Sequence, residues 1–223
     1  MRQNSVGEIG GTVRQRAEQE LRDRILTGVL PAGTRLDLDR ISEEFGISRT
    51  PVREALLELS FQGLVEIAPR SRVTVIGASP SETMDNFATL AALSGRAAQW
   101  AAERIKPEAL KELESLAEAL ATAPPGPELI ELNWRFHHII NRAAGVPHLL
   151  SLMRQAVRLI PSNFLAVIPV HNQAEHAELL DCLRRGEAMR ARAAAEQHVL
   201  GGGEALANWL RERGQPEEPS ATG

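Results

Sequence analysis

The hydrophobic residues near the beginning of the chain recur at helical spacing. Between residues 12 and 28 the apolar positions lie four apart, on one face of an amphipathic helix that ends at Gly28; they are Val13, Ala17, Leu21 and Ile25. A turn over residues 30–33 follows, and a second, short helix fits residues 37–45. After Gly46, Ser48 is a suitable N-cap for a third helix, whose apolar face comprises Val52, Ala55, Leu56 and Leu59. Two short helices joined by a glycine turn predict a helix-turn-helix.

The next apolar residues form two short β-rich runs. Residues 64–67 and 73–76 are rich in valine and isoleucine, and they flank the polar segment 68–72. This pattern predicts a small β-hairpin, the wing of a winged helix-turn-helix. The β-branched enrichment ends near residue 79, where we expect a domain boundary.

The rest of the chain has the alanine- and leucine-rich periodicity of helices. Proline and glycine breaks divide it into predicted helices at residues 80–104, 107–122, 127–144, 146–160, 172–185 and 187–211. Three adjacent glycines, Gly201 to Gly203, disfavour the last helix by about 3 kcal/mol relative to alanine, so we expect a kink or a split there. Residues 213–223 are small and polar and predict a disordered tail.

The predicted fold class is therefore mainly α. A flexible N-terminal tail (residues 1–10) precedes a winged helix-turn-helix with a small β-hairpin wing (11–78), and an all-α antiparallel helical bundle follows (79–212). The composition, with 43% hydrophobic residues, is sufficient for two modest cores.

Composition also narrows the function classes. One cysteine, Cys182, excludes an internal disulfide framework, and no apolar run predicts a signal peptide or a membrane span. We therefore expect a soluble, cytoplasmic protein with no membrane partner. The net charge of −4 argues against a polycation that coats nucleic acid, but a site-specific DNA-binding protein needs only one positive face.

The third predicted helix has the side chains that a DNA-reading helix needs. Arg49 and Arg53 lie one turn apart on the same face, near the hydroxyls of Ser48 and Thr50. Guanidinium groups suit guanine edges or phosphate oxygens, and a helix N-terminus suits phosphate. By spacing alone, a surface helix with two solvated arginines is an equally good interpretation.

The segment from Leu21 to Val75 resembles the winged-helix domain of the GntR family. The resemblance rests on the phrases LRDRILTG at residues 21–28, PAGTRL at 31–36, ISRTPVREAL at 47–56 and GLV at 63–65. It implies that Ser48, Arg49, Thr50 and Arg53 make the main contacts to double-stranded DNA, and that the wing enters the minor groove. It also implies a homodimer on a palindromic operator. Ser71 follows Arg70 where the family usually has glycine.

Further arginines of this domain are candidates for contacts to the DNA backbone. They are Arg35, Arg40, Arg70 and Arg72, and each of them is equally well interpreted as an ordinary solvated charge.

All six histidines of the chain lie beyond residue 136, and three of them are candidate metal ligands. Asn133 and His137 are four apart on one predicted helix, and His176 and His198 lie on two later ones. Three imidazoles and one oxygen suit a divalent ion such as Zn²⁺, Ni²⁺ or Mn²⁺. Spacing does not show that the helices bring these residues together, so scattered core or surface histidines remain an alternative.

Residues 80–211 resemble the FCD ligand-binding domain of the FadR branch of GntR regulators, in its VanR-like subgroup. The matching features are Phe136-His137 with an oxygen ligand four residues before, the helix from His176 to Leu183, Gly186-Glu187-Ala188, and His198. The resemblance implies a metal and a small-molecule effector bound near it. Two departures are Asn133, where aspartate is usual, and Leu90, where the family often has an arginine for the effector carboxylate. Candidate effector-pocket residues are Arg96, Trp100 and Asn141.

The resulting functional hypothesis is a transcription regulator, a repressor in most of this family, whose affinity for its operator is controlled by a small metabolite such as an organic acid. Two alternatives are a metalloregulator that senses the ion itself and a metal-dependent hydrolase, because an Asn/His site with an open position can activate water.

Overall fold

The computed structural model describes residues 11–69, 72–167 and 173–217, and the chain divides into two compact units between Ala78 and Ser79. The end of the β-branched enrichment near residue 79 lies at this division. Among the described residues, no helix is both long enough and apolar enough to cross a membrane.

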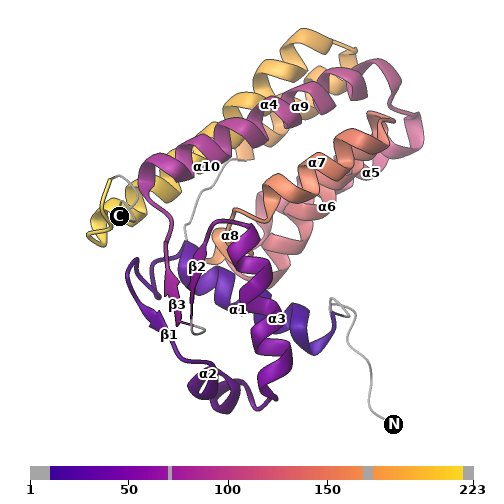
Figure 1. Ribbon diagram of the computed structural model, residues 1–223. Coiled ribbons are helices and arrows are strands. Elements are labelled where there is room, and N and C mark those ends of the chain that lie inside the picture. Colours follow the sequence, from indigo (N-terminus) through magenta and orange to yellow (C-terminus); the bar gives the residue numbers. More distant parts are fainter. Residues whose placement is uncertain (1–10, 70–71, 168–172, 218–223) are drawn as a thin grey trace. The chain divides into compact units, whose positions relative to one another are not determined.

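The first unit is a helix-turn-helix with a small sheet (Figure 1). Its elements are α1 (Val13–Leu26), β1 (Arg35–Leu36), α2 (Leu38–Phe45), α3 (Arg49–Phe61), β2 (Val65–Ala68) and β3 (Arg72–Val75). The strands β2 and β3 form the predicted antiparallel hairpin, with Val65 opposite Val75 and Ala68 opposite Arg72. The strand β1 was not predicted, because its two residues are too few for a recognisable pattern. It pairs with the other edge of β3 and makes a three-stranded sheet in the order β1-β3-β2.

Local sequence explains where these helices begin and end. Thr12 caps α1 through a capping box with Gln15, and Asp37 caps α2 by accepting hydrogen bonds from the N–H groups of Asp39 and Arg40. Gly46 ends α2 in the left-handed region, at φ 62°, which other residues rarely adopt. The apolar faces predicted for α1 and α3 meet in one core with the inward residues of the sheet, such as Leu21, Leu56 and Val73.

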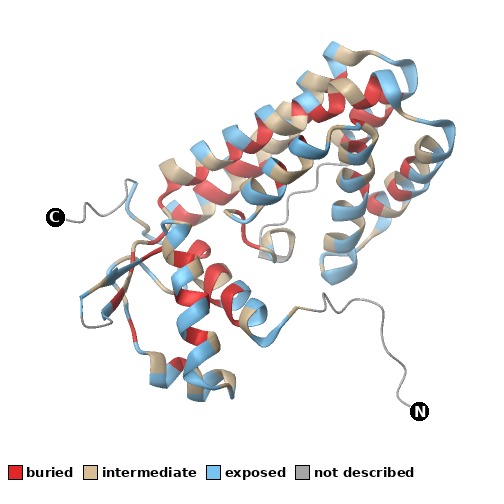
Figure 2. Ribbon diagram, turned by 45° about the vertical axis from the view of Figure 1, so that its right-hand side comes forward, coloured by how far each residue is buried: buried red, intermediate tan, exposed pale blue. Residues whose placement is uncertain are grey.

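The second unit is an all-helical bundle. Its helices are α4 (Pro80–Arg104), α5 (Pro107–Thr122), α6 (Pro127–Ala143), α7 (Pro147–Val157), α8 (Phe164–Val167), α9 (Gln173–Arg185) and α10 (Ala188–Glu212). The two longest helices, α4 and α10, run side by side along the bundle (Figure 1). In Figure 2 the buried residues of this pair form a stripe that faces the other helices. The predicted bundle is correct, although the helix expected at 146–160 ends at Val157 and the one-turn helix α8 was not predicted.

The expected break at Gly201 to Gly203 is wrong, because α10 is continuous through all three glycines. The reason is a close approach between α4 and α10. A Cβ atom on Gly203 would lie 2.6 Å from the Cβ of Phe87, and one on Gly202 would lie 3.3 Å from Cε1 of the same ring. The packing of Phe87 against the glycines offsets their poor helix propensity.

The C-terminal segment also differs from the expectation of disorder after residue 212. Residues 213–217 fold back on the bundle, where Arg211 forms an ion pair with Glu217 at 2.8 Å and Ser81 N–H donates to the Glu217 carbonyl. The predicted tails at residues 1–10 and 218–223 lie outside the described residues.

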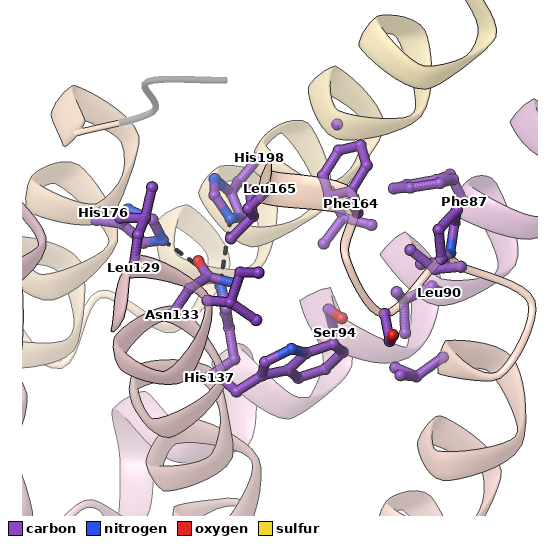
Figure 3. A pocket seen from close by; sticks show the side chains of 18 of the residues that line it. Phe87, Leu90, Ser94, Leu129, Asn133, His137, Phe164, Leu165, His176 and His198 are labelled. Carbon is purple, nitrogen blue, oxygen red and sulfur yellow. Dashed lines mark hydrogen bonds between the residues drawn. The ribbon is translucent and has the colours of Figure 1, made fainter. Parts of the chain in front are cut away.

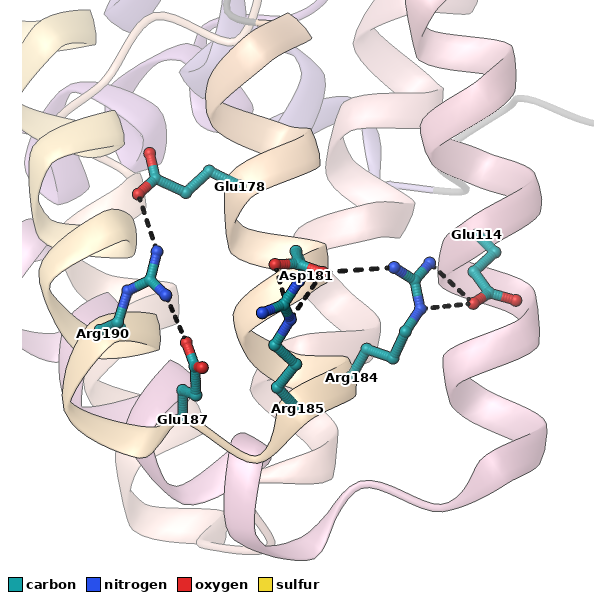
Figure 4. Close-up of polar contacts among 7 residues, drawn as sticks. All are labelled: Glu114, Glu178, Asp181, Arg184, Arg185, Glu187 and Arg190. Atoms are coloured by element: carbon teal, nitrogen blue, oxygen red, sulfur yellow. Dashed lines mark hydrogen bonds and ion pairs between the residues drawn. The ribbon is translucent and has the colours of Figure 1, made fainter.

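Charged residues link helices at one end of the bundle (Figure 4). Arg184 of α9 reaches Glu114 of α5 at 3.0 Å, and Arg190 of α10 reaches Glu187 at 2.6 Å and Glu178 of α9 at 3.9 Å. These side chains are one-third exposed or more, so each pair contributes about 1 kcal/mol or less. The core of the bundle therefore supplies most of the rigidity on which a binding site depends.

Candidate functional site

The first candidate site is the exposed face of α3. Its opposite face is buried through Val52, Ala55, Leu56 and Leu59. This fixes the helix so that the side chains predicted to contact DNA point to solvent; they are Ser48, Arg49, Thr50 and Arg53. Ser48 is the N-cap residue, yet its hydroxyl makes no capping hydrogen bond, and the residues at this end of α3, Ser48 to Thr50, are exposed. The arrangement suits an anionic partner.

A buried polar cluster ties α3 to α1. Arg22 forms an ion pair with Glu18, and both residues are less than 5% exposed. Gln62, the C-cap residue of α3, joins them by accepting from Arg22 Nε at 3.0 Å and donating to Glu18 Oε1 at 3.1 Å. This cluster fixes the far end of α3 against α1.

The other arginines considered for DNA contacts lie on different elements of this unit. Arg35 of β1, Arg40 of α2 and Arg72 of β3 are exposed, and Arg70 lies outside the described residues. An acidic residue that spacing does not reveal adjoins the predicted contacts: Asp39 of α2 forms an ion pair with Arg49. Both side chains are well exposed, so this pair competes with any external anion for the Arg49 guanidinium.

The second candidate site lies in the bundle, where three histidines from three helices meet. His137 of α6, His176 of α9 and His198 of α10 direct their Nε2 atoms at one another. The Nε2 atom of His137 is 3.4 Å from that of His176 and 3.1 Å from that of His198 (Figure 3). The buried ring of Phe136 supports the cluster, with its edge-on contact to His176 at 4.9 Å between centroids. The three histidines, whose spacing in the sequence did not show whether they meet, therefore lie together in the structure.

Burial favours the neutral form of two of these imidazoles, those of His137 and His198. It lowers the pKa of His137 well below its usual value, and the neighbouring rings of His198 and His176 lower it further. Burial also lowers the pKa of His198, and the hydrogen bond that His198 donates to Glu175 opposes this shift. Neutral imidazole is the form that binds metal.

The spacing of the three nitrogens fits a single metal ion. Adjacent ligand nitrogens that each lie about 2.0–2.1 Å from an ion are separated from one another by roughly 2.8–3.4 Å in octahedral or tetrahedral geometry. The separations of His137 Nε2 from the other two nitrogens, 3.1 and 3.4 Å, fall in this range, and all three ligand atoms lie within 4.8 Å of one another. Asn133, one turn before His137 on α6, points its amide toward the cluster (Figure 3). These four residues can therefore hold a divalent cation.

A cavity of about 140 Å³ adjoins the cluster. Figure 3 shows its two ends: the histidines and Asn133 lie at one, and Phe87, Leu90 and Phe164 lie at the other. An apolar cavity of roughly this size accommodates a benzene ring. No lysine or arginine of the described segments lines it, so a bound molecule meets apolar walls and the polar cluster.

The residues predicted for the effector pocket do not all reach this cavity. Asn141, one turn after His137, lines it, and so does Leu90. Arg96 and Trp100 do not line it: Arg96 is exposed on α4, where its guanidinium lies over the Trp100 ring at 5.4 Å and donates to Gln99. The cavity lining therefore includes neither Arg96, which is exposed, nor Trp100, which is half-buried.

Two contributions to the site have no signal in residue spacing. Glu175, directly before His176, accepts a hydrogen bond from Nδ1 of His198 at 2.9 Å. Phe164, from the unpredicted helix α8, forms part of the apolar end of the cavity and contacts Phe87 at 5.8 Å between ring centroids. Both depend on contacts between helices that are distant in sequence.

Comparisons with known proteins agree with this arrangement. Residues 13–75 match the family described as "Bacterial regulatory proteins, gntR family", and residues 85–201 match the FCD domain. The HTH-type transcriptional regulator McbR of Escherichia coli is 30% identical over 148 residues, which are 65% of this chain and 67% of McbR. An uncharacterized HTH-type regulator of Mycobacterium tuberculosis is 25% identical over 188 residues, 77% of each chain.

Among solved structures, that of E. coli McbR/YncC superposes with a TM-score of 0.66 at 23% identity, over 91% of this chain and 99% of that one. This likeness shows the same fold. The hydrolase hypothesis fails, because both domains and the relatives are those of regulators. The chain therefore belongs to the GntR family of bacterial transcription regulators, as a DNA-binding regulator with an FCD domain and not as an enzyme.

Proposed function

We propose that this protein is a homodimeric repressor whose affinity for a palindromic operator is controlled by a small molecule bound beside a metal in the FCD domain. The observation that carries the proposal is the convergence of three imidazoles at one end of an apolar cavity, in a chain whose helix α3 has an exposed face with two arginines.

The first turn of α3 enters the major groove in this proposal. Arg49 and Arg53 read base edges or phosphates, while Ser48 and Thr50 contact the backbone. Arg35, Arg40, Arg70 and Arg72 add phosphate contacts outside the recognition helix. A two-fold dimer places two such helices on the two halves of a palindrome.

Footprinting on the promoter region of the protein's own gene, followed by fluorescence anisotropy on the protected site, tests this step. Arg49→Ala and Arg53→Ala should each weaken binding about 5- to 150-fold, since a good bidentate contact is worth about 1–3 kcal/mol. Arg154→Ala, at an exposed position on α7, is a charge-matched control. Sequence-selective affinity that survives both α3 substitutions in a folded dimer would contradict the proposal, as would a monomeric mass by light scattering.

The three histidines and Asn133 hold Zn²⁺, Ni²⁺ or Mn²⁺ in this proposal. The four neutral ligands leave the ion with its positive charge and with room for a further ligand, so a carboxylate or another oxygen donor of the effector completes its coordination. Calorimetry with each metal and elemental analysis of protein purified without chelator test the site. His137→Ala should abolish binding, whereas His138→Ala, at the exposed neighbouring position, should not.

The cavity indicates what kind of effector fits. Its polar end is the metal cluster and its other end is aromatic and aliphatic, so we infer a small organic acid with an apolar body, of the size of a single ring. Zinc-loaded protein should bind benzoate more tightly than citrate, which would bury additional charged groups against apolar walls. Leu90→Arg should reverse this preference, while Leu152→Arg, at an exposed position on α7, should not.

Direct metal sensing is the second candidate function, because the three histidines come together without any organic ligand. Titration of zinc into the protein–operator complex without an organic acid separates the two functions. A large change in operator affinity favours metal sensing, and no change until the acid is added favours the effector-controlled repressor.

A further inference from the structure

We propose that Glu175 is a positioning residue of the metal centre: its carboxylate holds His198 in the tautomer that binds metal and supplies the negative charge that Asn133 lacks. This inference rests on the metal site proposed above.

The geometry at His198 separates the roles of its two ring nitrogens. Nδ1 lies 2.9 Å from Oε2 of Glu175, and Nε2 lies 3.1 Å from Nε2 of His137. A carboxylate only accepts hydrogen bonds, so Nδ1 of His198 must bear the proton. In a neutral ring the lone pair is then on Nε2, on the side of the other two histidines. The carboxylate therefore selects the tautomer that a metal needs.

The sequence places Glu175 for this role through the helical rotation of α9. Successive residues of a helix differ by about 100° in direction, so Glu175 and His176 leave α9 toward different neighbours. His176 reaches His137 of α6, whereas Glu175 reaches His198 of α10. One turn after His198, Gly201 has no side chain, and a Cβ built there would lie 3.9 Å from Oε1 of Glu175. Even with a Cβ this contact would be an ordinary van der Waals one, so position 201 does not crowd the carboxylate.

The contact between Glu175 and His198 also brings a negative charge close to the metal site. The three imidazoles and the Asn133 amide are neutral ligands, so they offset none of the charge of a divalent ion. The Glu175 carboxylate is hydrogen-bonded to His198 of this set, and its side chain is 34% exposed while that of His198 is 12% exposed. A partly buried anion one imidazole away from the ion stabilises the bound state and increases the basicity of His198.

Zinc affinity, measured by competition with a chelator, tests the role of Glu175 in the full-length protein. Glu175→Ala should weaken zinc binding about 10- to 100-fold, the range found when such supporting groups are removed. Glu175→Gln retains an acceptor but removes the charge, so it should cause a smaller loss. Glu178→Gln, on the exposed side of the same helix, is the matched control and should leave zinc affinity unchanged.

A second pair of measurements separates positioning from a merely structural role. Nitrogen NMR of the metal-free protein should show His198 protonated on Nδ1 in the wild type and a mixture of tautomers in Glu175→Ala. Asn133→Asp moves a negative charge into the ligand set itself. It should therefore increase zinc affinity more in the Glu175→Gln background than in the wild type, where Glu175 already supplies the charge.

The outcomes distinguish this inference from the proposed metal site. Zinc binding that is lost in His198→Ala but unchanged in Glu175→Ala and Glu175→Gln would overturn the role of Glu175 and leave the metal site intact. An unaltered His198 tautomer in Glu175→Ala would overturn the positioning role alone. Failure of the folded wild-type protein to bind zinc, nickel or manganese would overturn both proposals.

Discussion

The side chain of Phe87 on α4 occupies the space that any side chain at position 203 of α10 would need. A Cβ on Gly203 would lie 2.6 Å from the Cβ of Phe87, closer than such atoms approach in proteins. The same ring lines the apolar end of the cavity, so the glycine sets the position of one wall of the candidate site.

Gly203→Ala should therefore destabilise the protein. Alanine gains about 1 kcal/mol of helix propensity, but overpacking by one methyl group in a closed core costs about 1–3 kcal/mol and displaces Phe87. Gly201→Ala is the matched comparison, because its Cβ would be 3.9 Å from the nearest atom, an ordinary contact. It should stabilise the protein by up to about 1 kcal/mol. Urea denaturation measures both, and equal effects of the two substitutions would contradict this explanation.

This contact also shows that the sequence pattern of one helix does not reveal its contacts with distant helices. Helix propensity alone predicts a break at the three glycines. The residue that requires them, Phe87, lies more than 100 residues away in the sequence. The same limit applies to Glu175 and to Arg96. Glu175 acts on a histidine of another helix, and Arg96 was assigned to a pocket from its helix position although it points to solvent. By contrast, local periodicity is sufficient to predict α3 and its exposed arginines.

The buried ion pair between Arg22 and Glu18 predicts a large effect on stability. Arg22→Met removes the guanidinium from a buried carboxylate and from Gln62, so we expect a loss of about 3–5 kcal/mol of unfolding free energy. Arg24→Met, two residues along α1, is the comparison. Arg24 also pairs with two carboxylates, Glu20 and Glu44, but its side chain is 28% exposed, and about 1 kcal/mol or less is expected. Chemical denaturation followed by circular dichroism checks the difference, which would be absent if Arg22 were only a surface residue.

The low pKa of His137 predicts that the metal-free protein loses stability in mild acid. In the unfolded chain this histidine takes up a proton near pH 6.5, whereas burial and the two neighbouring imidazoles keep it neutral in the folded state. The unfolded state thus binds more protons below about pH 6.5, and unfolding free energy falls as the pH decreases from there toward the folded-state pKa. It should be insensitive to this group above about pH 7.5.

Urea titrations between pH 5 and 8 in the presence of a chelator measure this slope. His137→Gln should flatten it, because the variant has no proton to gain at this position. His138→Gln, which alters the exposed neighbour, should retain the slope of the wild type. An unchanged slope in His137→Gln would assign the acid sensitivity to other groups.

The ion pair between Asp39 and Arg49 predicts a substitution that strengthens DNA binding. Arg49 leaves Asp39 when its guanidinium turns to a base or phosphate, and an exposed pair of this kind is worth about 0.2–1 kcal/mol. Asp39→Asn removes that competition and one negative charge near the DNA, so operator affinity should increase about 1.5- to 5-fold at low salt, and less at high salt. Glu43→Gln removes an equal charge from the same helix and controls for the general field.

A double-mutant cycle decides whether the gain passes through Arg49. If Asp39 acts by holding this guanidinium, Asp39→Asn should have no more effect than Glu43→Gln once Arg49 is alanine. The same gain in both backgrounds would instead show that Asp39 acts on the DNA only through its long-range charge. Fluorescence anisotropy across a series of salt concentrations distinguishes the two results, since a released arginine that gains a phosphate contact increases the salt dependence of the binding constant by nearly one ion.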